Sequence, residues 1–556
     1  MMCARFLKPT RQEGHNLAYR LSENGFNKLL AGYDHGLRWV LKHQPLTLGI
    51  TLATVCLSVF LYIIIPKGFF PQQDTGSLMG TIQASQDISF AAMRVKQLQF
   101  SNIVMTDPAV DTLGGIIGGG ALNIGRMFIQ LKPLSERKVS ADQIIARLRP
   151  KLAVVPGATV FLQANQDIRV GGRQSNSQYQ YTLESESLSD LNTWAPRMYD
   201  KLRTLPGLRD VSTDQQVKGL EAELVIDRDT AYRLGVPAQT IDNTLYDAFG
   251  QRQVSTVFTQ MNEYHLVMEV APQFQDNTDA LKNIYVRSSN GTQVPLSAFT
   301  HFEALTTSLA VNHQGQIPAI TLSFNLAPGV ALGDAVNSIE QAALQMGMPA
   351  SIRANFAGTA EAFQDSLSNQ PILILAALAA VYIVLGMLYE SYIHPVTILS
   401  TLPSAGVGAL LALLLWRLDL SVIAIVGVVL LIGIVKKNAI LMIDFALEAQ
   451  RTGRMSPEDA IYQSCLLRFR PIMMTTSAAL LGALPLAIGT GTGSELRRPL
   501  GISIVGGLIV SQMLTLFTTP VVYLYMDRLR VFLSGQEERS AAPDLRPSPL
   551  PGSPVA

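Results

Sequence analysis

The chain has 556 residues, of which 48% are hydrophobic and only 15% are charged, and its mean hydropathy is +0.24. This composition is too apolar for a soluble protein of this length, so it predicts a substantial membrane component. The net charge of +1 argues against a nucleic-acid-binding protein, which usually carries a strong basic excess. No zinc-type cluster of cysteine and histidine is visible, so no metal or other cofactor is expected.

The three cysteines, Cys3, Cys56 and Cys465, all lie outside the polar region 69–369, so no disulfide can brace that region. The opening MMCARFLKPT has no apolar core and is not a signal peptide. Residues 16–42 mix apolar and basic positions in the pattern of an amphipathic helix lying on the cytoplasmic membrane surface. The first membrane span is predicted at 45–65, and Pro66 and Lys67 end it.

The polar region that follows alternates strand-like and helix-like segments. Its first part is close to the order β-α-β-β-α-β, the ferredoxin-like split pattern, with one strand not placed. The predicted strands are 76–84, 126–131 and 158–162, and the predicted helices are 89–105 and 140–152. The pattern then recurs in segments 179–183, 187–205, 211–213, 221–226, 320–325, 332–346 and 351–356. An insertion near 216–306 interrupts this second copy, so an internal duplication is predicted.

Five further spans are predicted at 371–388, 395–416, 421–445, 471–488 and 500–525. The Pro-rich tail from Asp527 onward is predicted to be disordered. Six spans put both termini on one side of the membrane. The loop 448–470 is basic, so the positive-inside rule makes that side cytoplasmic and the polar region periplasmic in a Gram-negative cell. Arg497 and Arg498 run against this rule as a minority.

The span at 421–444 carries Lys436, Lys437 and Asn438 among apolar residues. A lysine there costs about 2.5–3.5 kcal/mol on insertion scales. Both lysines can in principle extend toward the nearer surface. Adjacent helix positions point about 100° apart, however, so the two cannot easily follow one route. We therefore expect Lys437 to face the inside of a helix bundle and to need an acidic or polar partner there.

Arg468 and Thr475 lie seven residues apart at the start of the next span, which places them on one helix face. Taken alone, Arg468 fits a cytoplasmic anchor, and Thr475 fits a threonine bonded to the helix backbone. Together with Lys437 and Asn438 they are candidates for a proton relay. Such a relay needs a carboxylate, yet Asp444 and Glu390 lie only at span edges. The chain is thus expected to hold one half of a charge cluster.

Several long motifs resemble the RND efflux permeases, of the MdtB/MdtC multidrug type, over almost the whole chain. They are GIVKKNAILMIDFALEAQ, LLRFRPIMMTTSAALLGALPLA, YESYIHPVTILSTLPSAGVGALLAL, PKGFFPQQDTGSLMG, QDIRVGGRQSNSQYQYTL, AFGQRQVST and LAVNHQG. The resemblance implies a proton-driven multidrug antiporter of the bacterial inner membrane and no enzyme. It also implies a homo- or heterotrimer, in the latter case with an MdtB-like subunit, that joins a periplasmic adaptor protein and an outer-membrane channel.

Those permeases have twelve spans, and this chain resembles only their C-terminal half. The resemblance places Lys437, Asn438, Arg468 and Thr475 at relay positions opposite paired aspartates, which belong to the family's first half. The implied divisions are 1–44 (end of a preceding span and surface helix), 45–65 (span), 66–165 (porter unit), 166–215 with 307–369 (second porter unit), 216–306 (inserted funnel or docking subdomain), 370–526 (five spans) and 527–556 (tail).

Within the first porter unit, residues 113–123 resemble the family's switch loop between drug pockets. Well-known multidrug members carry phenylalanines there, whereas this segment is rich in Gly and Ile. The resemblance makes Phe128 and Ile117 candidates for the substrate pocket. The competing interpretation of Phe128 is a core residue on the strand RMFIQL.

Several alternatives remain open. A separate chain can supply the first half, the gene can be a truncated non-functional remnant, or the recorded sequence can be incomplete at its start. A membrane receptor that senses a periplasmic ligand is a different class, although it has no need of a lysine in mid-membrane. An intramembrane enzyme lacks support from any catalytic motif. A metal exporter is expected to show clustered methionines, whereas Met79, Met93, Met105 and Met127 are scattered.

Overall fold

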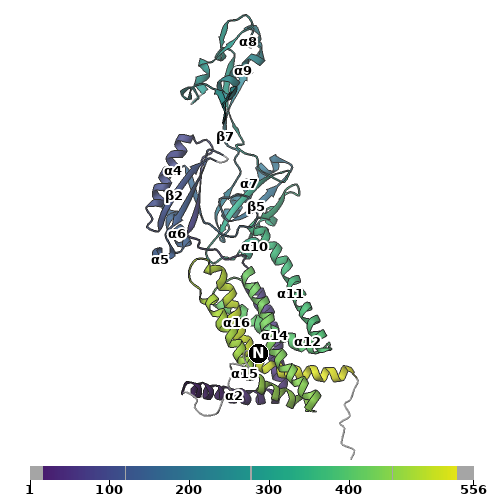
Figure 1. The fold of residues 1–556 in the computed structure, drawn as a ribbon. Coiled ribbons are helices and arrows are strands. Elements are labelled where there is room, and N and C mark those ends of the chain that lie inside the picture. The colour runs from purple at the N-terminus through teal and green to yellow at the C-terminus, as the bar shows by residue number, and fades with distance from the viewer. Residues whose placement is uncertain (1–16, 119–120, 276–277, 454, 535–556) are drawn as a thin grey trace, which may run out of the picture.

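The computed structural model describes residues 17–118, 121–275, 278–453 and 455–534. It is an elongated molecule with a bundle of long helices at one end, a sheet-rich region above them and a smaller subdomain at the far tip (Figure 1). Among the described residues, six helices are long and apolar enough to cross a membrane, judged by length and composition. The composition-based prediction of a membrane component with six spans is therefore confirmed at this level.

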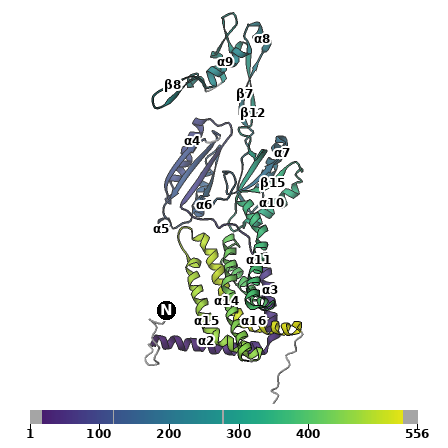
Figure 2. The same cartoon turned by 45° about the vertical axis from the view of Figure 1, so that its right-hand side comes forward.

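Helix α2 (Leu17–Lys42) lies across the base of the bundle, crosswise to the long helices (Figures 1 and 2). The hydroxyl of Tyr33 donates to the carbonyl of Leu516 at 3.0 Å, which ties α2 to the last helix of the bundle. The first spanning helix, α3 (Gln44–Ile64), follows almost at once. Both helices were predicted within one residue of these bounds, and residue 16 lies outside the described part of the chain.

The first sheet unit contains β1 (Ser77–Ala84), α4 (Phe90–Met105), β2 (Val110–Ile117), β3 (Ile124–Leu131), the short α5 (Leu134–Arg137), α6 (Ala141–Leu152) and β4 (Ala158–Ala164). Its strands lie in the antiparallel order β2-β3-β1-β4. Both helices cover one face, where Phe100 and Leu148 are fully buried. The predicted rhythm is present, and β2 is the strand that the sequence left unplaced.

Strand β2 corrects the interpretation of 113–123 as a loop, because residues 113–117 belong to that strand. Its glycines obscured the strand pattern, and the structure gives one of them a reason. A Cβ at Gly115 would collide with the Gln97 side chain of α4, which donates to the Arg126 carbonyl at 3.2 Å. Residues 119 and 120 lie outside the described residues.

The second sheet unit repeats the arrangement with β5 (Tyr179–Glu184), α7 (Leu188–Arg203), β6 (Leu208–Thr213), β14 (Ile317–Leu326), α10 (Leu332–Met346) and β15 (Arg353–Ala357). The order β6-β14-β5-β15 matches that of the first unit, and the short β13 (His313–Gln314) adds to the edge of β14. The predicted duplication is therefore present. The segment 221–226 is not part of this sheet, because it pairs within the insertion.

The insertion leaves the second unit through a two-stranded stalk of β7 (Gly219–Ile226) and β12 (Thr300–Thr307). It carries its own core of Ala231, Val236, Ile241, Val286, Leu296 and Phe299. Its remaining elements are α8 (Arg228–Arg233), α9 (Ala238–Phe249), β8 (Arg252–Phe258), β9 (Glu263–Met268), η1 (Pro272–Phe274), η2 (Thr278–Asn283), β10 (Tyr285–Arg287), β11 (Gln293–Pro295) and η3 (Leu296–Ala298). The β8–β9 hairpin projects sideways from the tip (Figure 2).

The remaining bundle helices are α11 (Thr359–Tyr389), α12 (His394–Leu399), α13 (Leu402–Leu415), α14 (Val422–Gly453), α15 (Pro457–Ile488) and α16 (Ser494–Ser534). Most are longer than the predicted spans, because a helix continues through polar sequence once its backbone bonds are made. The basic segment 448–470 is thus mostly helical rather than a loop. Helix α16 likewise runs past Asp527, where a disordered tail was predicted, and residues 535–556 lie outside the described part.

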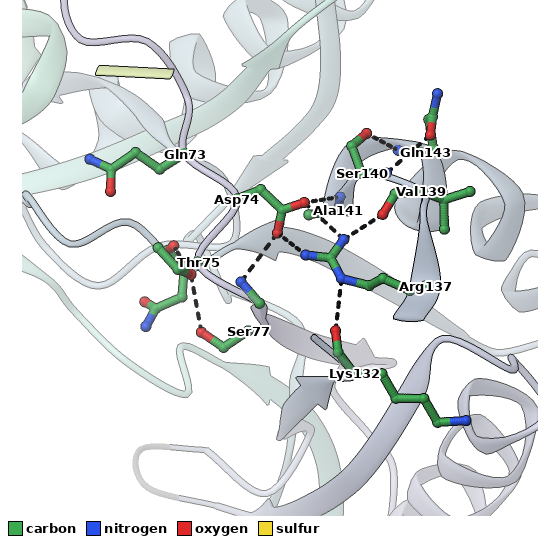
Figure 3. A network of polar contacts seen from close by, with 12 residues as sticks. Gln73, Asp74, Thr75, Ser77, Lys132, Arg137, Val139, Ser140, Ala141 and Gln143 are labelled. Atoms are coloured by element: carbon green, nitrogen blue, oxygen red, sulfur yellow. Dashed lines mark hydrogen bonds and ion pairs between the residues drawn. The ribbon is translucent and has the colours of Figure 1, made fainter. Parts of the chain in front are cut away.

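The linker between α3 and β1 joins the bundle to both sheet units. The carbonyls of Pro66 and Phe69 accept hydrogen bonds from Leu420 and Val422 at the start of α14, and the Lys67 carbonyl accepts from Gly333 of α10. A few residues later the buried Asp74 is held by Arg137, as Figure 3 shows. Its carboxylate oxygens lie 2.8 and 2.5 Å from the guanidinium and also accept from the backbone N–H groups of Ala141 and Gly76.

Candidate functional site

Helix α14 carries its polar residues about halfway along its length, on different sides of the helix. Asn438 is buried, Lys436 is half-buried and Lys437 is exposed. Neighbouring helix positions point about 100° apart, so turning Asn438 into the bundle turns Lys437 outward. The expectation that Lys437 faces the inside of a bundle is therefore not met by the six helices of this chain alone.

Asn438 is the centre of a buried polar contact between three helices. Its amide nitrogen donates to the hydroxyl of Thr476 on α15 and to the side-chain oxygen of Gln512 on α16, both at 3.0 Å. The Thr476 hydroxyl also donates to that Gln512 oxygen at 2.9 Å. Because these bonds are shielded from water, they fix α14, α15 and α16 relative to one another at this level of the bundle.

Arg468 and Thr475 lie along the same helix pair but bond differently from one another. The Arg468 guanidinium lies 5.0 Å over the ring of Phe445 on α14, and its buried Nε has no hydrogen-bond partner. The Thr475 hydroxyl donates to the Ile472 carbonyl of its own helix at 3.1 Å, as the alternative interpretation of this residue expected. Arg468 therefore sits level with Phe445, about 12 Å along α14 from Lys437.

The four predicted residues thus lie on the neighbouring helices α14 and α15 and do not form a single compact cluster. The sequence analysis missed Thr476 and Gln512, which make the buried bonds to Asn438. Gln512 was detectable as a polar residue in the middle of an apolar span. Thr476 was not distinguishable from its neighbour, because only the packing decides which of two adjacent threonines faces α14.

No carboxylate pairs with Lys437 or Arg468 among the described residues. Asp444 lies on α14 toward the end remote from the sheets, where the Tyr389 hydroxyl donates to it at 2.5 Å. Glu390 is exposed directly after α11. Positive side chains are consequently present on both α14 and α15 in this part of the chain, without a negative counterpart beside them.

A second candidate site lies in the first sheet unit. A cavity of about 570 Å³ is lined by the exposed face of β1, β2 and β3 and by the segment that leads to β5. Phe128, with half of its surface exposed, lines this cavity together with Gln130, Arg169 and Gln174. Ile117 is not among its lining residues and packs against the core of the unit. Phe128 is therefore a surface residue of the cavity rather than a core residue.

Long apolar helices with charged residues along them, joined to a duplicated sheet region, define an integral membrane protein with a large extramembrane part. The chain belongs to the AcrB/AcrD/AcrF family, whose model matches residues 1–527. The resemblance to RND efflux permeases is thus confirmed, and this family consists of transporters rather than enzymes.

Among the curated relatives, the multidrug resistance protein MdtC of Escherichia coli O157:H7 is 55% identical over 544 residues. The MdtC of Escherichia fergusonii is also 55% identical over 544 residues. Each alignment covers 97% of this chain and 53% of the relative, so the chain spans about half the length of these proteins. The MdtC-like character inferred from the motifs is confirmed.

Two solved structures of a heavy metal efflux pump share the fold. They match with TM-scores of 0.81 and 0.80 at 23% sequence identity and cover 91% of this chain. The matched regions are 53% and 52% of the pump chains. At this identity the likeness supports the arrangement of helices and sheets and carries no information on what this chain transports.

Proposed function

We propose that the chain is the C-terminal half of an inner-membrane RND proton/drug antiporter that exports apolar or amphiphilic compounds. The observation that carries this proposal is the exposed Lys437 at mid-helix, which costs about 2.5–3.5 kcal/mol if it faces lipid. A first-half chain that brings carboxylates to this side of α14 would remove that cost. The 53% coverage of the MdtC relatives supports the same division.

In this proposal both termini are cytoplasmic and the sheet-rich region is periplasmic. Residues 66–165 form one ferredoxin-like porter unit, and residues 166–215 with 307–369 form the other. The identical strand order of the two sheets supports that assignment. The subdomain 216–306 then docks to an outer-membrane channel with the help of an adaptor protein. The complete pump is a homotrimer, or a heterotrimer with an MdtB-like subunit.

In this proposal, proton coupling uses the exposed Lys437 and the buried hydrogen bonds of Asn438 with Thr476 and Gln512. With carboxylates ionised opposite Lys437, opposite charges hold the two halves together. Protonating a carboxylate weakens that attraction, so α14 is released. Because Asn438 is bonded to both Thr476 and Gln512, α14, α15 and α16 move as one body. The proton gradient then shifts the population between two arrangements of the pump.

The movement can reach the substrate cavity through continuous structure. Helix α11 begins directly after β15 and carries Phe363, which is buried in the core of the second sheet unit. The linker at Pro66–Phe69 connects the start of α14 to the same unit, and Asp74 then clamps it to the first unit. A shift of the helices therefore changes the relative position of the two units and, with it, the cavity lined by Phe128.

The test is export of a fluorescent amphiphilic dye from cells that express this chain alone or together with a first-half chain of an MdtC-type permease. We expect efflux that stops on addition of a protonophore only when both chains are present. The Lys437→Met variant should abolish it, whereas Lys436→Met should leave most of it. Robust gradient-dependent efflux by this chain alone would refute the proposal.

A further inference from the structure

Buried polar groups without hydrogen-bond partners gather at the end of the bundle remote from the sheets. Here α12 begins, α14 ends and α16 crosses both. His394 Nδ1, Gln450 Nε2, the Thr519 hydroxyl and the Tyr523 hydroxyl are each buried and each lack a partner. His394, Thr519 and Tyr523 are at most 3% exposed. Buried polar atoms are rarely left unbonded, so this group of atoms requires something that bonds them.

These groups face one another across three helices. The His394 ring stacks on the Tyr523 ring with centroids 6.2 Å apart, and it also meets the ring of Tyr389 at 6.1 Å. Gln450 of α14 lies close to the Tyr523 hydroxyl, but the pair makes no well-formed hydrogen bond and the Gln450 amide nitrogen is left without a partner. Buried polar groups without a well-formed direct bond are commonly bridged by water.

The charges around the group leave it close to neutral. Asp527 of α16 pairs with Arg530 at 2.9 Å, and Arg451 of α14 is the other cation near His394. Asp444, bonded to Tyr389, supplies the remaining negative charge. Two positive and two negative groups balance, which disfavours a bound anion or cation. The described residues also contain no set of three metal-ligating side chains. Water, which both donates and accepts, fits this mixed set of atoms.

Two rows of buried polar residues, most of them bearing a hydroxyl group, lead from this group into the bundle. On α16 they recur at every fourth position, along one ridge of the helix: Ser511, Thr515, Thr519, Tyr523 and Asp527. The opposing row on α12 and α13 contains His394, Thr397, Thr401 and Ser404. Toward mid-bundle the rows are bonded to each other, since Ser404 contacts Ser511 at 3.3 Å and Thr515 at 3.4 Å.

We infer that His394, Gln450, Thr519 and Tyr523 line a water-filled site, and that His394 exchanges a proton there with the aqueous side at the far end of the bundle. A neutral imidazole keeps a lone pair on one ring nitrogen, which can accept a proton when the solution is acidified. The lone pair on one ring nitrogen of His394 accepts a proton from hydronium in the site, leaving water, and returns it by the reverse step. The inference does not rest on the proposed transport activity. Only the identification of this aqueous side as the cytoplasm rests on the proposed function.

The test is nuclear magnetic resonance of the full chain, labelled with ¹⁵N-histidine and reconstituted in lipid nanodiscs. The His394→Gln variant assigns the His394 signals by their loss. We expect those signals to receive magnetisation from water and to change once, as a single protonation step, on acidification from pH 7 to pH 3. Signals that receive none from water and stay constant over this range would overturn the inference.

A matched pair of threonine variants separates hydration from packing. Thr519→Val removes an unpartnered hydroxyl of the site, whereas Thr397→Val removes an equally buried hydroxyl that donates to the Ile393 carbonyl at 3.3 Å. The first should reduce the transfer from water to His394 severalfold and shift its titration midpoint, and the second should change neither. Tyr523→Phe should also shift the midpoint. Equal effects of the two threonine variants would contradict a water-filled site. This comparison holds even if the His394→Gln variant does not fold.

Discussion

Charged side chains are paired differently in the two main regions of the molecule. In the sheet-rich region Arg137 and Asp74 form a buried pair, and the partly exposed Arg147 and Arg149 pair with Asp107 and Asp210, the last pair joining the two sheet units. In the membrane bundle, the exposed Lys437 of α14 and Arg468 of α15 have no carboxylate partner among the described residues. These pairs of the sheet-rich region are formed within the chain, whereas Lys437 and Arg468 lack a carboxylate partner in the part of the chain that the structure describes.

The contrast shows in which region the charged side chains find their partners within this chain. An unpaired charge within a bilayer is costly, so it persists where it serves function or is matched by another chain. The sheet-rich region needs no such match to explain its buried ion pairs. Four predictions test this difference, in order of decreasing expected effect.

The largest effect is expected from removing one partner of the buried pair in Figure 3. Arg137→Met leaves the Asp74 carboxylate buried without its cation and should destabilise the first sheet unit by about 3–5 kcal/mol. The readout is urea unfolding of the full chain, followed by hydrogen exchange in β1 and α6. The control is Lys282→Ala at the exposed pair with Asp279, where about 0–1 kcal/mol is expected. Equal losses at both sites would show that burial gives the Arg137–Asp74 pair no special weight in the stability of the sheet unit.

A smaller effect is expected in the bundle, and only on its inner side. Asn438→Leu removes the buried donor and leaves Thr476 and Gln512 with fewer bonds, which should cost roughly 1–3 kcal/mol. Lys437→Met should leave the stability of the chain unchanged within error, because the side chain is exposed and makes no ion pair among the described residues. Thermal inactivation in detergent compares the two. A clear loss for Lys437→Met would mean that the chain itself already pairs this lysine.

The third prediction concerns pH in the sheet-rich region, at the base of the stalk. Burial raises the pKa of Asp214 from 3.8 to about 6, although it accepts a bond from the Thr321 N–H and lies 3.7 Å from Arg173. Because the folded state holds the proton more tightly than the unfolded state, this group's contribution to stability is full below about pH 4 and is lost as pH rises through 6. Two pKa units correspond to at most roughly 3 kcal/mol, and the 31% exposure of the side chain reduces this.

Hydrogen exchange of β14 in the full chain measures the Asp214 effect. Wild-type protection should fall between pH 4 and pH 7 relative to Asp214→Asn, which cannot ionise. Asp229→Asn, at an exposed position of the inserted subdomain, is the matched control and should follow the wild type. Identical pH profiles for wild type and Asp214→Asn would show that this carboxyl does not titrate as predicted.

The smallest effect is expected at the cavity of the first unit. Phe128→Ala removes a ring that is half exposed, so stability should change by less than about 1 kcal/mol. Export of an aromatic dye by the complete pump should nevertheless weaken, while Ile117→Ala should act mainly through the core of the unit. The paired readouts are the unfolding midpoint and the efflux rate. A larger loss of stability for Phe128→Ala than for Ile117→Ala would reverse these assignments.

The sequence was sufficient for what depends on local periodicity. Alternating segments located most strands, apolar windows located all six spans, and Lys437 stood out because it interrupts one of them. Strand β2 was missed because Gly114 and Gly115 carry no side chains that alternate. The ends of α14, α15 and α16 were missed because hydropathy reports the apolar window and not the backbone bonds beyond it.

The site was only partly predictable for a different reason. Asn438, Arg468 and Thr475 were identifiable as polar residues in or near spans, but their partners depend on which helix faces meet. Thr476 and Gln512 therefore emerged only from the packing of α15 and α16 against α14. The outward direction of Lys437 likewise follows from Asn438 being the residue that turns inward.

The most direct test of the central claim is a cross-link between Lys437→Cys and the proposed first half. A chain in which Cys3, Cys56 and Cys465 are serine carries Lys437→Cys or, as the matched control, Lys436→Cys, which points about 100° away. It is expressed with a first-half chain of an MdtC-type permease that has cysteine in place of either paired aspartate. We predict a disulfide with Lys437→Cys and little with Lys436→Cys. A cross-link at Lys436→Cys alone, or at neither position in a correctly assembled pair, would contradict the account.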